Sequence, residues 1–168
     1  MKFLWNGLIE AIKETIKLVL NNSAHKESIK ITLINHGSSA RVIFKDKEPT
    51  LDLIDKISYQ GGQTNLEKAL SLTYDTLLES KSQYDIFTVC FLAFEEEEKN
   101  YPQNIIDRIN SDSEKIKSKI NFNFIKIIEN SNPSLEKIAN SLKANYLIAN
   151  SPEELISIFK EIVNIGLK

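Results

Sequence analysis

Hydrophobic positions along the chain change their period from one segment to the next. Apolar residues recur every three or four positions from Leu4 to Leu20, which predicts an amphipathic helix with one buried face. Residues 29–34 and 40–44 alternate instead and are rich in β-branched side chains, so they predict two strands. A turn at residues 36–39 joins these strands and predicts a hairpin. A short helix is expected at residues 51–57.

The rest of the chain alternates apolar runs with helical patterns. Residues 84–94 form the longest apolar run and predict a central buried strand, and residues 122–128 and 146–148 predict two further strands. Helical spacing follows over residues 69–78, 105–120 (with a break near 111–113), 135–142 and 155–162. We therefore expect one α/β domain over residues 1–168, with a mostly parallel sheet between two helical layers.

Helix starts are marked by two capping sequences. Ser151 precedes Pro152 and stands three residues before Glu154, which predicts a capping box for the last helix. Thr64 and Glu67 have the same spacing, so we expect Thr64 to cap the helix that follows it.

Composition and charge exclude several function classes. The chain has 168 residues, 21 basic and 23 acidic, for a net charge of -2, so no basic excess favours nucleic-acid binding. The single cysteine, Cys90, lies in the apolar run and is expected to be a buried side chain. One cysteine cannot form an internal disulfide, which favours a reducing, cytoplasmic or intracellular setting. No segment predicts membrane insertion.

Two segments resemble one known family. Residues 31–44 are similar to the second and third strands of von Willebrand factor A (VWFA) domains, and residues 61–70 are similar to the family signature Gly-Gly-x-Thr-Asn-x-x-x-Ala-Leu. The resemblance implies a three-layer, doubly wound α/β/α fold with one antiparallel edge hairpin. It also implies a metal-ion-dependent adhesion site, in which an Asp-x-Ser-x-Ser loop, a Thr and a later Asp hold Mg²⁺.

The chain departs from that family pattern at the metal site. Only Thr64 matches a metal-binding position, and Phe94 stands where the later Asp is expected. The first strand and its Asp-x-Ser-x-Ser loop are missing, so we expect a degenerate site with no metal cofactor. Without this central strand, the hairpin pairs with residues 84–94, a partner or second copy donates a strand, or the chain is a fragment of a longer protein.

We interpret the sequence as a non-catalytic, metal-independent protein–protein interaction module whose partner is unidentified. The alternative is a fragment of a longer adhesion-type protein in which upstream residues supply the Mg²⁺ ligands. A small α/β enzyme is the third hypothesis, but neither a Gly-x-Ser-x-Gly elbow nor a Walker loop is present. The family geometry implies an interaction rim made of His36, Gly61, Gly62, Thr64, Asn65 and Glu95.

Overall fold

A computed structural model describes residues 2–22, 27–58, 65–93, 101–127 and 133–166. Its contacts divide the chain into two compact units that are interleaved in sequence. The first unit comprises residues 1–35, 42–60 and 149–168, and the second comprises residues 36–41 and 61–148. Among the described helices, none is long and apolar enough to cross a membrane.

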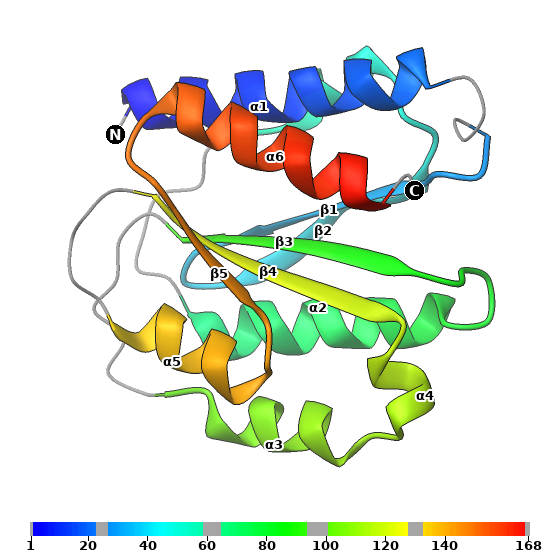
Figure 1. The fold of residues 1–168 in the computed structure, drawn as a ribbon, viewed down its shortest axis with the longest axis vertical. Coiled ribbons are helices and arrows are strands. Elements are labelled where there is room, and N and C mark those ends of the chain that lie inside the picture. The colour runs from blue at the N-terminus through cyan, green and yellow to red at the C-terminus, as the bar shows by residue number, and fades with distance from the viewer. Residues whose placement is uncertain (1, 23–26, 59–64, 94–100, 128–132, 167–168) are drawn as a thin grey trace. The chain divides into compact units, whose positions relative to one another are not determined.

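The first unit pairs the two ends of the chain. Helices α1 (Lys2–Asn21) and α6 (Pro152–Gly166) lie side by side (Figure 1), and Lys160 of α6 lies 3.5 Å from the Glu14 carboxylate of α1. Gly7 permits this approach, because a Cβ atom at this position would lie only 2.7 Å from the Cβ atom of Pro152. A glycine in α1 is thus explained by the start of α6.

The same unit holds most of the hairpin and a short helix. Strands β1 (Ile31–His36) and β2 (Ala40–Lys47) form a two-stranded sheet, and η1 (Leu51–Lys56) is a 3₁₀ helix. Leu53 of η1 and Phe44 of β2 are buried. The predicted hairpin and the predicted short helix are both confirmed.

The second unit is built on a three-stranded sheet in the order β3-β4-β5. Strands β3 (Phe87–Ala93) and β4 (Ile120–Ile127) run parallel, with Phe87 opposite Ile120, and β5 (Asn145–Ala149) lies on the other side of β4. Its helices are α2 (Leu66–Ser80), α3 (Gln103–Ser111), α4 (Glu114–Lys117) and α5 (Pro133–Ser141).

One hydrophobic core joins three of these helices to the sheet. Tyr74 of α2, Ile106 of α3 and Leu135 of α5 are fully buried together with Phe124 of β4. The rings of Phe91 and Phe124 lie 5.5 Å apart across β3 and β4. Burial of such large side chains drives this packing, because each contributes roughly 1.5–3 kcal/mol when removed from water.

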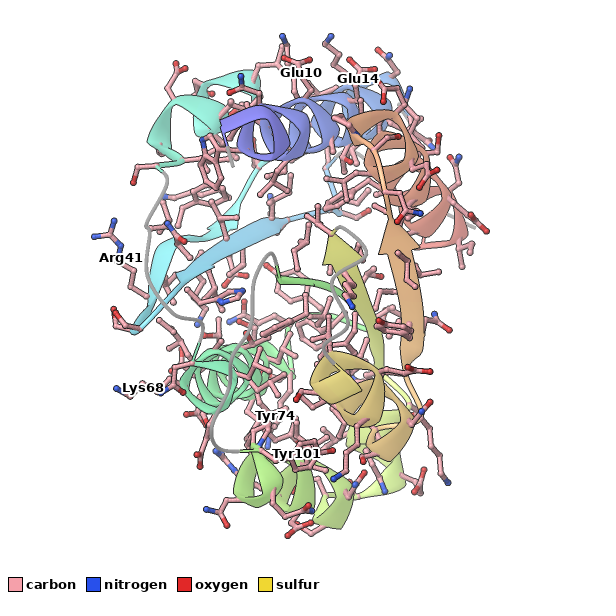
Figure 2. The ribbon with its side chains drawn as sticks, turned by 90° about the vertical axis from the view of Figure 1, so that its left-hand side faces the viewer. Glu10, Glu14, Arg41, Lys68, Tyr74 and Tyr101 are labelled. Atoms are coloured by element: carbon pink, nitrogen blue, oxygen red, sulfur yellow. The ribbon has the colours of Figure 1, made fainter. Side chains whose placement is uncertain are left out.

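A polar clamp also fixes α3 against α2. The Tyr74 hydroxyl donates a hydrogen bond to the Asp112 carboxylate, and the Arg108 guanidinium lies 5.4 Å from the centre of the Tyr74 ring. Arg108 also pairs with Asp75 at 2.7 Å. Figure 2 shows Tyr74 directed from α2 toward α3. Burial and the Asp112 hydrogen bond raise the pKa of Tyr74, so its phenol stays protonated as the donor.

The α/β class is confirmed, but the described strands form two separate sheets. The possibility that the hairpin pairs with residues 84–94 is therefore wrong for the described residues. The turn end of the hairpin reaches β3 and α2 through other contacts, which involve the His36 side chain and the Gly37 carbonyl. Whether a partner supplies a strand, or the chain is a fragment, stays a prediction, as does the single domain.

Candidate functional site

The predicted interaction rim falls partly within the described residues. His36 ends β1 and Asn65 precedes α2. The other four predicted rim residues, Gly61, Gly62, Thr64 and Glu95, lie outside the described residues. The same holds for Phe94.

His36 is held by its side chain against the end of β3. Its Nε2 atom lies 3.0 Å from the carbonyl oxygen of Leu92, and its ring stacks on Phe91 with 4.9 Å between the ring centres. Because a carbonyl oxygen only accepts hydrogen bonds, Nε2 carries the hydrogen. The other ring nitrogen, Nδ1, is buried and has no hydrogen-bond partner among the described residues.

This environment keeps the His36 imidazole neutral. Burial lowers its pKa, and the hydrogen bond to Leu92 opposes that shift only in part. A neutral ring whose hydrogen is already donated to a backbone carbonyl is suited to positioning the hairpin turn. It is poorly suited to act as a general base, since Nδ1 is enclosed.

Asn65 connects the start of α2 to the hairpin turn. Its N–H donates to the carbonyl oxygen of Gly37 at 2.7 Å, and its Oδ1 atom accepts from the N–H of Lys68 at 2.9 Å. Asn65 is therefore the N-cap of α2, and the prediction of Thr64 as the cap is wrong. Asn65 has an extended backbone and directly precedes Leu66, the first residue of the helix. Its side chain therefore reaches a backbone N–H of the first turn that has no partner within the helix.

These bonds join three segments that are distant in sequence. The hairpin turn contacts both the end of β3 and the start of α2, through His36 and Gly37. Ser38 and Ser39 at the tip of the turn are exposed, and Lys68 projects from α2 into solvent (Figure 2). The rim thus presents hydroxyl, amide and ammonium groups on a fixed backbone.

The described part of this rim offers little to a metal ion. Asn65 Oδ1 already accepts a backbone hydrogen bond, and His36 Nε2 is a donor. Within the described residues, no three His, Cys, Asp or Glu side chains come together to hold a metal ion.

Strand β3 has one side that does not pair with β4. The N–H of Phe87 donates to Lys119 at 2.7 Å, so the backbone groups of residues 87, 89 and 91 point toward β4. By alternation, the N–H and C=O groups of Thr88, Cys90 and Leu92 point the other way. His36 bonds the Leu92 carbonyl on that side. Burial raises the pKa of Cys90 to about 12, so its thiol stays protonated at neutral pH.

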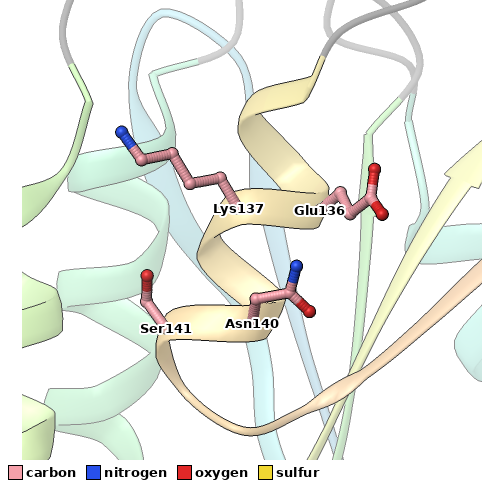
Figure 3. A pocket seen from close by; sticks show the side chains of 4 residues that line it. All are labelled: Glu136, Lys137, Asn140 and Ser141. Atoms are coloured by element: carbon pink, nitrogen blue, oxygen red, sulfur yellow. The ribbon is translucent and has the colours of Figure 1, made fainter.

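A hollow of about 450 Å³ lies along α5 and is lined by Glu136, Lys137, Asn140 and Ser141. Their side chains do not converge on one point (Figure 3). The Lys137 ammonium lies 4.4 Å from the centre of the Tyr101 ring, and the Ser141 hydroxyl is hydrogen-bonded to the Tyr101 hydroxyl at 3.0 Å. Two of the four lining residues thus pack α5 against Tyr101, and the four side chains form no convergent group, so this hollow is not a candidate site.

The comparisons with known proteins agree with this architecture. The model of the von Willebrand factor type A domain matches residues 5–161. No curated protein matches the chain. Among solved structures, proximal thread matrix protein 1 from the mussel byssus has a TM-score of 0.69 at 13% identity, over 99% of this chain and 43% of that one.

Two further structures extend the comparison. A von Willebrand factor type A protein from Catenulispora acidiphila has a TM-score of 0.65 at 17% identity, over 93% of this chain and 37% of that one. The mussel protein with a zinc-occupied MIDAS motif has a TM-score of 0.67 at 14% identity, over 99% of this chain and 43% of that one. The chain therefore spans less than half the length of these solved chains.

Proposed function

Since the chain belongs to the von Willebrand factor type A domain family, we propose that it is a non-catalytic protein-interaction module that works without a bound metal ion. Its partner is another protein, and the interaction surface is the rim that carries His36 and Asn65. The single cysteine favours an intracellular setting for this interaction.

The observation that carries this proposal is the bonding of the hairpin turn to two other segments. The His36 bond to Leu92 and the Asn65 bond to Gly37 fix the turn through groups of the protein itself. A partner therefore meets a preorganised surface, which lowers the entropy cost of binding. The exposed side chains at the tip, Ser38 and Ser39, are positioned for contact.

A photo-crosslinking experiment tests the rim and the metal independence together. A benzoylphenylalanine at position 38 is expected to capture the same partner with and without EDTA. The control places the same group at Asn140, which is exposed near the end of α5 and lies outside the rim. Equal capture from both positions, or no capture from position 38, contradicts the rim. Capture that EDTA abolishes contradicts metal independence.

The proposal of metal independence has a direct calorimetric test. Titration of Mg²⁺, Mn²⁺ or Zn²⁺ into the chain is expected to give no binding heat. The alternative is a longer Mg²⁺-dependent protein whose upstream residues supply the missing ligands. That alternative predicts Mg²⁺ binding only after the chain is extended upstream.

The side of β3 away from β4, which pairs with no strand among the described residues, supports a second candidate, strand-mediated self-association. The seven residues of β3 include no charge, no Pro and no Gly, which are the residues that commonly block edge pairing. His36 occupies the Leu92 carbonyl at the end of this side, so pairing would involve the part of the strand before Leu92. Thr88 is exposed, and its backbone N–H and C=O groups point to this side. We expect a concentration-dependent dimer in sedimentation analysis that Thr88→Lys abolishes and Ser118→Lys preserves. A monomer at all concentrations contradicts this candidate.

A further inference from the structure

A second hollow, of about 380 Å³, lies at the amino ends of β3 and β4 within the second unit. It is bounded by the end of α2 and by α4, which lie at the end of the sheet where β4 begins (Figure 1). This is the opposite end of the parallel strands from the rim described above. Its volume is within the range of ligand-binding pockets.

The floor of this hollow is apolar. Five of its ten lining residues are large hydrophobic side chains that remain partly exposed: Leu77, Leu78, Phe87, Ile116 and Ile120. Partly exposed hydrophobic side chains that cluster in a concave surface with a polar border are typical of interaction sites. A large apolar side chain inserted here would remove more of this surface from water.

The border of the hollow is basic. Lys81, Lys115 and Lys119 line it, and none of its ten lining residues is acidic. The Lys119 ammonium donates to the carbonyl oxygens of Lys81 and Tyr84, each at 3.3 Å, so its charge is held at the border by neutral acceptors.

The acidic neighbour of Lys115 in sequence is paired with another lysine. Glu114 pairs with Lys117 at 2.7 Å, and this pair lowers the pKa of the Glu114 carboxyl group. Lys81 and Lys115 are exposed, and neither forms an ion pair within the described residues. The hollow therefore combines an apolar floor with three ammonium groups that face no carboxylate in its lining.

We propose that this hollow binds an acidic peptide segment of a partner protein, which inserts one large apolar side chain and sets Asp or Glu residues against the lysines. Complementary charge around a buried apolar anchor is a common arrangement at protein interfaces. The hollow is concave and so receives a side chain, whereas binding to an anionic membrane requires apolar side chains that protrude into the lipid. This site is separate from the proposed rim and does not depend on it.

The first test is selection of peptides from a random phage-displayed library on the whole chain. We expect enriched sequences with Leu, Ile or Phe flanked by Asp or Glu. An enriched peptide, labelled with fluorescein, is then titrated by fluorescence anisotropy. Its affinity is expected to fall steeply as the salt concentration rises.

Charge reversals then locate the binding site. Lys81→Glu and Lys115→Glu change exposed side chains, and each is expected to weaken peptide binding about tenfold. The matched control is Lys68→Glu on the rim side of α2, which is expected to change the affinity less than about twofold. A folded Phe87→Ala variant, checked by circular dichroism, is also expected to lose binding.

Three results would overturn the proposal. The first is a selection that enriches no acidic peptide. The second is an acidic peptide whose affinity is unchanged by both Lys81→Glu and Lys115→Glu. The third is lysine-dependent binding to phosphatidylserine vesicles that exceeds binding to the peptide. Failure of the crosslinking test at the rim would not affect the proposal for the hollow. The two sites are distinguished by Lys68→Glu, which reverses a charge on the rim side of α2.

Discussion

Asn123 is a buried polar residue in the central strand β4, with only 4% of its surface exposed. Its Nδ2 atom donates to the carbonyl oxygens of Val89 and Asn121, each at 3.2 Å. Its Oδ1 atom accepts a hydrogen bond of 2.9 Å from Nδ2 of Asn145 on β5. One side chain thus links all three strands of the sheet, and we predict that its removal strongly destabilises the second unit.

The expected magnitude for Asn123→Ala follows from its three hydrogen bonds. Each contributes about 1 kcal/mol to the free energy of unfolding, so their loss costs about 3 kcal/mol. For a chain of this size, each 1 kcal/mol lowers the melting temperature by roughly 2–4 °C, so a decrease of about 6–12 °C is expected. Asn145→Ala removes one bond at an exposed position and should cost about 1 kcal/mol.

The assay is urea unfolding followed by circular dichroism, together with hydrogen exchange of the β3 and β4 amides. Asn121→Ala is the matched control, because its side chain is exposed on the same strand and its carbonyl remains. The control should change stability by less than about 0.5 kcal/mol. In a double-mutant cycle, Asn123 and Asn145 should couple by about 1 kcal/mol.

Two outcomes would refute this reasoning. If Asn123→Ala costs no more than the Asn121→Ala control, the buried amide does not stabilise the sheet. If the two variants are strictly additive in the cycle, the bond between Asn123 and Asn145 is not formed in solution.

Three further predictions concern other contacts. Burial lowers the pKa of His36, so the unfolded state takes up a proton at a higher pH than the folded state does. The contribution of His36 to stability should therefore be full above its unfolded pKa of about 6.5 and decrease as the pH falls below that value. His36→Phe should flatten this dependence in thermal unfolding, and an unchanged slope would show that another group titrates. Tyr74→Phe removes the donor to Asp112 and should cost about 1–2 kcal/mol by urea unfolding; no loss would mean that the clamp contributes nothing. Gly7→Ala places a methyl group against Pro152 and should cost about 1–3 kcal/mol, followed by the fluorescence of the single tryptophan; a stabilised variant would contradict the close approach.

The elements of the fold were largely predictable from local pattern. The helical period from Leu4 to Leu20 corresponds to α1, and the break predicted near residues 111–113 separates α3 from α4. The Ser151 half of the capping box is also confirmed, since Ser151 Oγ accepts from the N–H of Glu154. The Glu154 carboxylate accepts from the N–H of Asn150, one residue before the predicted partner. These features depend on neighbouring residues, which the sequence states directly.

Boundaries were less predictable where two residues compete for one role. Thr64 and Asn65 are both good N-cap residues, and the spacing to Glu67 favoured Thr64. The extended backbone of Asn65 and its hydrogen bond to the N–H of Lys68 identify Asn65 as the N-cap. A difference of one residue in the start of a helix is not visible in a pattern with a period of 3.6.

The sequence by itself determined the α/β class, the order of helices and strands, and the family signature at residues 61–70, because all three are local in the chain. Only the tertiary structure decided that His36 meets Leu92, 56 residues away, and that Asn123 links three strands. It also brought Lys81, Lys115 and Lys119 around one apolar floor. Such contacts join segments whose separation in sequence carries no periodic signal, so they exist only once the core has packed.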